Sequence, residues 1–548
     1  MKAVENVDAV VVGTGFAGVY AIHKLRSLGL SVRAFEAGSD VGGTWYWNKY
    51  PGARCDVESL EYSFGFSNEI QQKWDWSHRF SFQPDIQRYI AHVADTVDVR
   101  QLIEFNTKVV SQTYDEKQQR WAVSTDKGEV IHCSFCVMAT GILSVPLYPD
   151  IPGLDSFTGE KYHSGAWPSE PVDFTGKRVA VFGTGATGIQ IVPEVAKQAS
   201  RLFVMQRTAN FSLPAGNKPL RPEDVETYRK DYPERRKRAR KHIFGISNVP
   251  EPTRSVLELS EEEANAAFEK LWEMGGSLNF QMAFNDFMKD ERANKRLADF
   301  VRRKIRETVK DQATAEKLCP YDHPIGSRRI CIDTGYYETY NRDNVELISL
   351  RETPVKRITP KGIETEAGEI EVDAIVFATG FDGITGALTH IDIAGRNGVK
   401  LSEQWQKEVG SYMGFTVHGF PNMFIITGPG SPAVKSNMVM SIEQHVELIG
   451  DTIAYMRSRG LGAIEATAEA ERAWMERVSE IANKTLFVKA DSWYNGANVA
   501  GKARGFTIYV GGVNNYRLEV ENMIADGYRG MVLEPLRSDQ KTEARASL

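Results

Sequence analysis

Two glycine-rich turns carry the first chemical signal in this chain. The segments G-T-G-F-A-G and G-T-G-A-T-G repeat one glycine spacing, at Gly13, Gly15 and Gly18 and again at Gly183, Gly185 and Gly188. Glycines at this spacing let backbone amides approach a pyrophosphate at the positively polarised start of a helix. Each segment stands between an apolar run and a helix-patterned run, which is the context that this chemistry requires. The pair therefore predicts two dinucleotide-binding sites.

The residue that would bind each adenosine ribose differs between the two units. Glu36 lies 18 positions after the third glycine of the first turn, where a carboxylate binds both ribose hydroxyls and repels a 2′-phosphate. The same offset in the second unit gives Gln206, followed by Arg207 and Thr208. A guanidinium is a planar, multiple donor to phosphate. We therefore expect FAD, or NAD, at the first unit and NADPH at the second.

An FAD unit beside an NADPH unit passes hydride from nicotinamide to flavin, which leaves the final electron acceptor open. A disulfide acceptor would require a reactive cysteine pair, and Cys133 and Cys136 do form a C-x-x-C motif. We interpret them as structural, because side chains alternate along the strand expected there and place the two thiols on opposite faces. Oxygen is then the expected acceptor.

The elements that position both turns define the expected architecture. Apolar strands flank each turn, and the segments at 136–141 and 374–382, which both end an apolar strand in A-T-G, are expected to close one lobe and pass the chain to the other. The predicted fold class is α/β, with two Rossmann-like dinucleotide-binding domains and a helical insertion. The predicted bounds are 1–145 and 383–548 for the FAD domain, 146–220 and 325–382 for the NADP domain with an inter-domain linker at 151–170, and 221–324 for the insertion.

Composition restricts the partners of the chain. It has 548 residues, of which 66 are Lys or Arg and 72 are Asp or Glu, and the net charge of −6 argues against a nucleic-acid partner. Five scattered cysteines suit a reducing compartment, and no apolar run reaches the roughly 18 residues of a membrane span. We expect a cytoplasmic protein without nucleic-acid or membrane partners, a monomer or weak oligomer, and no metal site.

Two further motifs resemble signatures of a known family. F-T-G-E-K-Y-H-S-G-A-W-P, from Phe157 to Pro168, resembles the F-x-G-x-x-x-H-x-x-x-W-[P/D] signature of type I Baeyer–Villiger monooxygenases. Related flavin N- and S-oxygenases end a similar motif in Phe or Tyr. The segment from Gly42 to Asp56 matches the family's second signature, [A/G]-G-x-W-x-x-x-x-[F/Y]-P-[G/M]-x-x-x-D. The resemblance runs from about residue 8 to residue 530 and looks closest to the phenylacetone, steroid and cyclohexanone monooxygenase group.

This resemblance implies an FAD-containing, NADPH- and O2-dependent enzyme that converts ketones to esters or lactones through a flavin C4a-peroxide. It places Arg329 at the position of the family's catalytic arginine and Asp56 at that of the carboxylate that holds this arginine. The expected partners are a small-molecule ketone and O2. A flavin-dependent N- or S-oxygenase is the alternative enzyme, and a nucleotide-sensing regulator without turnover is the alternative from another class.

The resemblance also implies positions for cofactor and substrate binding. Beyond the glycines, Glu36, Asp56, Arg207 and Thr208, the cofactor positions are Gly43, Thr44, Trp45, Thr140, Thr187, Gln190, Arg328, Met438 and Trp493. The positions expected to line the ketone pocket are Val57, Ile142, Leu143, Pro432, Ala433, Val434 and Met438. They are small or apolar and suit a neutral ketone, whereas Lys435, Ser436 and Asn437 in the same loop are polar. His163 and Trp167 are expected to organise the hinge between the lobes.

Overall fold

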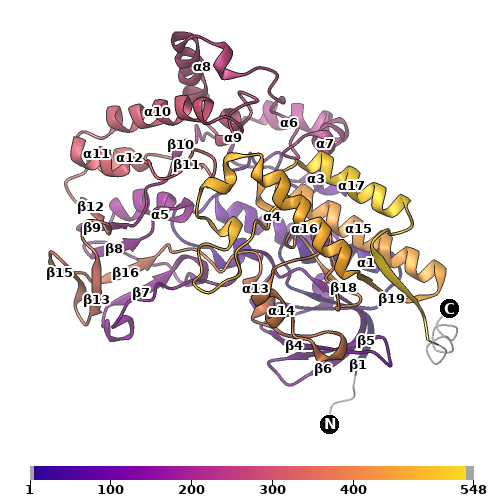
Figure 1. The fold of residues 1–548 in the computed structure, drawn as a ribbon. Helices are drawn as coiled ribbons and strands as arrows, with labels where there is room; N and C mark the ends of the chain where they lie inside the picture. The colour runs from indigo at the N-terminus through magenta and orange to yellow at the C-terminus, as the bar shows by residue number, and fades with distance from the viewer. Residues whose placement is uncertain (1–4, 538–548) are drawn as a thin grey trace.

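An eight-stranded sheet forms the first lobe of the chain, of which the computed structural model describes residues 5–537 (Figure 1). Its strands run in the order β17-β4-β5-β6-β1-β2-β3, and β18 pairs with β6. Their bounds are β17 (Asp392–Ala394), β4 (Val109–Asp115), β5 (Arg120–Thr125), β6 (Val130–Met138), β1 (Glu5–Val12), β2 (Val32–Phe35), β3 (Ile103–Glu104) and β18 (Met423–Ile425). Early and late parts of the chain therefore share one sheet.

A five-stranded parallel sheet forms the second lobe and carries the second glycine turn. Its strands, in spatial order, are β12 (Val345–Ser349), β9 (Arg201–Gln206), β8 (Arg178–Phe182), β16 (Ala374–Phe377) and β7 (Glu160–His163). Helices pack on these strands, so the predicted α/β fold class with two Rossmann-like units is confirmed. The domain bounds stay predictions.

The side chains of β1 alternate between two hydrophobic cores. Ala9 and Val11 pack in the core that contains α1 (Phe16–Ser27) and α15 (Met438–Arg459), whereas the next residue after each of them packs in the core on the other face. A strand covered on both faces needs apolar residues at every position, which explains the uninterrupted apolar run. β1 accordingly lies between β6 and β2 in the sheet.

Both glycine turns bring a strand unusually close to the helix that follows. A Cβ atom added to Gly18 in α1 would lie 1.9 Å from the Gly13 carbonyl oxygen, and one added to Gly188 in α5 (Ala186–Ala196) would lie 2.0 Å from the Gly183 oxygen. Such a separation excludes any side chain at the third glycine. Gly13 and Gly183 have φ values of +93° and +108°, which other residues rarely adopt.

Six helices occupy the range predicted for the insertion. They are α6 (Pro222–Lys230), α7 (Tyr232–Lys241), α8 (Glu261–Met274), α9 (Ser277–Gln281), α10 (Glu291–Thr308) and α11 (Gln312–Leu318). Helices α8 and α10 extend outward at the top of Figure 1, and α7 contacts α17 (Val513–Ala525). Across the described residues, every helix is too short or too polar to cross a bilayer.

Cys133 and Cys136 are arranged differently from the expectation drawn from strand alternation. Both side chains lie in the same core and their Sγ atoms are 3.5 Å apart. Along β6, Ile131 and Cys133 lie in the same core as Cys136 and Met138, whereas Phe135 and Val137 lie in the core on the other face, so the alternation is interrupted between the two cysteines. The alternation rule assumes an undistorted strand. Both thiols are fully buried, so a disulfide substrate in solution cannot reach them. Their structural role stays our interpretation.

The close approach in the first turn gives a stability prediction. In Gly18→Ala the new methyl group would overlap the Gly13 carbonyl, and we expect the free energy of unfolding to fall by about 1–3 kcal/mol. Urea unfolding of the purified proteins measures this change. Gly505→Ala is the matched control, because a methyl group there meets no atom within 4 Å. Equal stability of the two variants would contradict the packing argument.

Candidate active site

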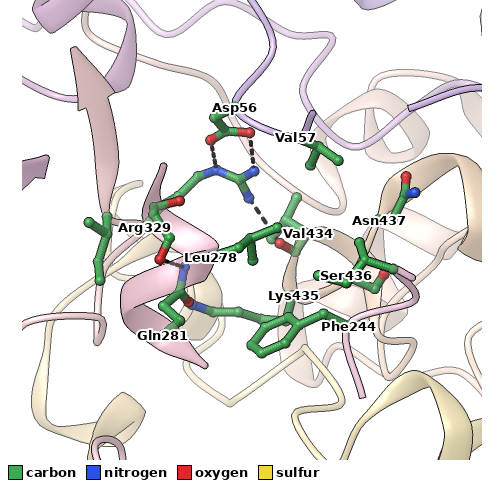
Figure 2. A pocket seen from close by; sticks show the side chains of 13 residues that line it. Asp56, Val57, Phe244, Leu278, Gln281, Arg329, Val434, Lys435, Ser436 and Asn437 are labelled. Atoms are coloured by element: carbon green, nitrogen blue, oxygen red, sulfur yellow. Dashed lines mark hydrogen bonds and ion pairs between the residues drawn. The ribbon is translucent and has the colours of Figure 1, made fainter. Parts of the chain in front are cut away.

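An ion pair between Arg329 and Asp56 lies at the centre of the candidate site (Figure 2). Arg329 Nε is 2.5 Å from Asp56 Oδ2 and Nη2 is 2.5 Å from Oδ1, so the guanidinium donates two parallel hydrogen bonds. Nη1 donates a third bond of 2.9 Å to the Val434 carbonyl oxygen. Asp56 follows α2 (Thr44–Trp47), Arg329 precedes β11 (Cys331–Asp333), and Val434 precedes α15. Three distant segments therefore meet at one guanidinium.

This pair fixes the charge of both side chains. Burial alone would raise the pKa of Asp56, but the charge and hydrogen bonds of Arg329 outweigh burial and lower the pKa below its usual value of 3.8. For Arg329, burial would lower the pKa, and Asp56 more than offsets that effect, so the pKa is raised. The site therefore holds a permanent cation whose side chain is still 33% exposed.

A cavity beside the ion pair is lined from five parts of the chain. The lining residues are Asp56 and Val57; Phe244 and Ile246; Ser277, Leu278 and Gln281; Arg329 and Ile330; and Val434, Lys435, Ser436 and Asn437. Figure 2 shows them around the Arg329 guanidinium. Helix α9 of the insertion thus supplies part of the wall, and no motif in the sequence indicated this contribution.

Lys435 adds a second cation that the predicted pocket residues did not include. Its Nζ lies 4.2 Å from the ring centroid of Phe487 and 4.9 Å from that of Tyr494. Burial and the charge of Arg329 lower the pKa of Lys435 well below its usual value of 10.5, although Asp56 acts in the opposite direction. The signal available in the sequence was one lysine in a loop of mostly small residues.

The first glycine turn forms a surface suited to a dinucleotide. A Cβ atom added to Gly15 would lie 3.3 Å from the Cα atom of Gly43, so two glycine-containing turns lie against each other. Glu36 is buried, and its Oε2 accepts hydrogen bonds from the Thr14 amide at 2.8 Å and the Thr14 hydroxyl at 3.0 Å. Trp45, on α2, is buried two residues after Gly43. Open backbone amides and a nearby carboxylate fit a pyrophosphate and a ribose.

Three arginines gather beyond the second glycine turn. Arg351 Nη2 lies 3.4 Å from Thr208 Oγ1 and 2.6 Å from an Asp322 carboxylate oxygen. Burial lowers the pKa of Arg328, Asp322 opposes that shift, and the positive charges of Arg207 and Arg351 add to it. This concentration of positive charge fits a phosphate group. Arg351 was missed in the sequence because it lies outside both glycine motifs.

The remaining predicted cofactor positions differ in their surroundings. Gln190 is already engaged, since its Oε1 accepts a 2.9 Å hydrogen bond from Tyr50 and its Nε2 donates to the Arg54 carbonyl at 3.2 Å. Its amide therefore joins the second lobe to the segment that leads to Asp56. Thr44 begins α2, Thr140 lies beside Gly13, Thr187 lies in α5, Met438 begins α15, and Trp493 begins a short 3-10 helix, Trp493–Asn495.

Two of the seven predicted pocket positions line the cavity described here. They are Val57 and Val434. Ile142, Leu143, Pro432, Ala433 and Met438 are outside its lining. Leu143 instead faces Trp493 across Gly383, where an added Cβ atom would lie 3.7 Å from Leu143 and 3.0 Å from the indole ring. A role in substrate binding stays a prediction for these five residues.

His163 makes a local contact within its own segment, whereas Trp167 contacts the first lobe. The His163 side chain is fully enclosed, and its Nδ1 accepts a 3.0 Å hydrogen bond from the Gly165 amide. The Trp167 amide donates at 3.4 Å to the carbonyl oxygen of Trp47, which ends α2 of the first lobe. Burial lowers the pKa of His163, which keeps the imidazole neutral at neutral pH. Their role in a hinge stays a prediction.

Known proteins resemble this chain over nearly its whole length. Residues 7–227 match the family described as flavin-binding monooxygenase-like. A Baeyer–Villiger monooxygenase from Pseudooceanicola batsensis is 41% identical, with 96% of each chain covered. Phenazine N-monooxygenase PhzNO1 from Lysobacter antibioticus is 42% identical, with 96% of this chain and 97% of that protein covered. A crystal structure of OTEMO in complex with FAD and NADP is 41% identical, has a TM-score of 0.92, and covers 96% of this chain and 99% of its own.

The Arg329–Asp56 pair predicts a pH-dependent contribution to stability. We expect Asp56→Asn to lower the free energy of unfolding by about 1–3 kcal/mol at pH 7, between the values for exposed and fully buried ion pairs. The folded protein has the lower Asp56 pKa, so the difference from the parent persists above about pH 4 and shrinks as the pH falls below 3.8. Urea unfolding at a series of pH values measures the difference.

The control for this series is Asp224→Asn, which removes an exposed ion pair with Arg221 and costs less than about 1 kcal/mol. If Asp56→Asn cost no more than this control, the active-site pair would not stabilise the fold.

Proposed function

Because the chain belongs to the Baeyer–Villiger monooxygenases, within the flavin-binding monooxygenase-like family, we propose that it uses FAD, NADPH and O2 to convert a ketone into an ester or lactone at the cavity beside Arg329. The observation that carries the proposal is the bidentate Arg329–Asp56 pair, which holds a permanent cation at that cavity. This arrangement suits a reaction in which negative charge develops on oxygen.

The first glycine turn would hold FAD. Gly13, Gly15 and Gly18 leave the start of α1 open to a pyrophosphate, and Glu36 would accept hydrogen bonds from the ribose hydroxyls. When bound, the flavin supplies the redox chemistry, accepting hydride from NADPH and delivering an oxygen atom from O2 to the substrate. The protein would position the flavin and the substrate and supply the electric field around the reacting atoms.

The second glycine turn would hold NADPH. Gly185 has open space on its Cβ side, which permits the close approach of a pyrophosphate to α5. Arg207, Thr208, Arg328 and Arg351 would together bind the 2′-phosphate. The Arg328 side chain is held by a hydrogen bond of 3.1 Å from its Nε to the Asp491 carbonyl oxygen.

Arg329 would stabilise negative charge on the reacting oxygen atoms. The guanidinium keeps its proton at any working pH, and Asp56 and the Val434 carbonyl oxygen fix its plane before the substrate arrives. Val57 and Leu278 line the same cavity and limit the access of water, which strengthens electrostatic interactions inside it.

The reaction is tested by incubating the purified holoenzyme with NADPH, isotopically labelled O2 and a panel of ketones. We expect an ester or lactone that contains one labelled oxygen atom, with one NADPH oxidised for each product molecule. Oxidation of NADPH that yields only hydrogen peroxide across the panel would overturn the proposal. The panel also includes an aromatic N-heterocycle, because a phenazine N-monooxygenase is among the relatives. N-oxide without any ester would assign N-oxygenation instead.

The proposed role of Arg329 predicts a separation of two half-reactions. In Arg329→Ala, NADPH should still reduce the bound FAD, whereas ester formation should fall by about 10²–10³-fold, as for the loss of one charge-stabilising donor. Stopped-flow absorbance measures flavin reduction, and product analysis measures ester. Arg221→Ala, at an exposed position, is the control. Retained ester formation in Arg329→Ala would rule out this role.

The arginine cluster predicts the coenzyme preference. Arg207→Ala should raise the KM for NADPH by about 10–100-fold, since a charge-assisted bond to the 2′-phosphate is lost, and leave the KM for NADH unchanged. Arg351→Ala should act in the same direction. Steady-state kinetics with both coenzymes measure the effect, and Arg201→Ala, at the exposed first residue of β9, is the control. A parallel rise for NADPH and NADH would contradict a 2′-phosphate site.

A further inference from the structure

Lys435 brings to the cavity a positive charge that the proposed reaction does not use. Its Nζ donates a long hydrogen bond of 3.4 Å to the Gly326 carbonyl oxygen. Within residues 5–537 it takes part in no ion pair with a carboxylate. A lysine ammonium has three donors, and a partly buried ammonium without enough partners is unfavourable. Donors of Lys435 that lack a partner would be available to a ligand in the cavity whose wall includes this residue.

The charges around this cavity are not balanced. Among its lining residues as described, Asp56 is the one carboxylate, and Arg329 engages both of its oxygens. Glu58 and Glu61 line an adjoining cavity, where Glu58 accepts a hydrogen bond from the Arg79 side chain and Glu61 accepts one from the Ser247 amide. When Lys435 is protonated, two cations and one carboxylate leave an excess positive charge among the residues that line the cavity. This excess favours an anionic ligand.

Two aromatic rings hold the Lys435 ammonium in one place. Phe487 is 9% exposed and Tyr494 is 1% exposed, and both ring centroids lie within 5 Å of Nζ. Cation–π attraction to two buried rings favours the charged form of the side chain, which opposes the lowering of its pKa by burial and Arg329, and it limits the movement of the ammonium. An anion would therefore meet an ammonium at a defined position, separate from the guanidinium that Asp56 already engages.

We propose that Lys435 is a specificity-determining residue that selects ketones carrying a carboxylate, with the carboxylate bound by Lys435 and the ketone group turned toward Arg329. The inference rests on the proposed function and replaces the neutral ketone expected from the sequence with a keto acid. Because Lys435 would bind the carboxylate and Arg329 would face the ketone, the distance between these two side chains determines which length of keto acid fits best.

The test compares keto acids with their methyl esters. Holoenzyme is assayed with ω-1 keto acids of increasing chain length and with the matching esters, for the parent, Lys435→Met and Lys435→Arg. We expect the parent to prefer one acid over its ester in kcat/KM by at least about 10-fold. Lys435→Met should lower this acid-to-ester ratio by about 10–100-fold, and Lys435→Arg should restore most of it. Lys356→Met, at an exposed ion pair on β13 (Val355–Thr359), is the control.

A binding measurement separates this inference from the proposed reaction. Hexanoate, which has no ketone to oxidise, should bind the parent holoenzyme in calorimetric titrations and bind Lys435→Met about 10–100-fold more weakly. If hexanoate binds in this way but no ketone is converted, the anion site stands and the proposed reaction fails. If parent and Lys435→Met bind hexanoate equally, or if the parent prefers the esters, the inference is overturned.

Discussion

The bidentate contact between Arg329 and Asp56 is the interaction on which the site depends. It can form only when Asp56 of the first lobe, Arg329 after the helical insertion and Val434 before α15 are placed within hydrogen-bonding distance of one another. An ion pair with this much burial is favourable only in good geometry, so both sheets and α15 must be positioned correctly first. The same contact that supplies a cation for chemistry therefore also joins the lobes.

The parts of this structure that could be predicted from the sequence are those fixed by local rules. At Gly18 and Gly188 a carbonyl oxygen occupies the space that a Cβ atom would need, so no other residue fits there. These glycines therefore mark the two turns in the sequence. The uninterrupted apolar run Ala9–Val12 in β1 follows from burial of the strand on both faces. The second family signature placed Asp56, the wider resemblance placed Arg329, and the structure brings these two side chains together. Each prediction depended on a short segment.

What could not be predicted depends on contacts between segments. Helix α9 lines the cavity although nothing in its composition marks it, and Arg351 joins the arginine cluster from outside the glycine motifs. The prediction that Cys133 and Cys136 lie on opposite faces was wrong because the regular alternation of β6 is interrupted between them, and a simple alternation rule does not include such an interruption. Lys435 could be seen in the sequence, but its proposed role in binding an anion follows only from its position beside Phe487 and Tyr494 and from the engagement of Asp56 by Arg329.

The division of the eight-stranded sheet along the chain has a consequence for biosynthesis. Strands β1 to β6 lie within residues 5–138, the five-stranded sheet lies within 160–377, and β17 and β18 follow at 392–394 and 423–425. On the ribosome, the second lobe can therefore complete its sheet while β4 still lacks β17 and β6 still lacks β18. The nascent chain carries unpaired strand edges throughout that interval, and such edges are where misassociation begins.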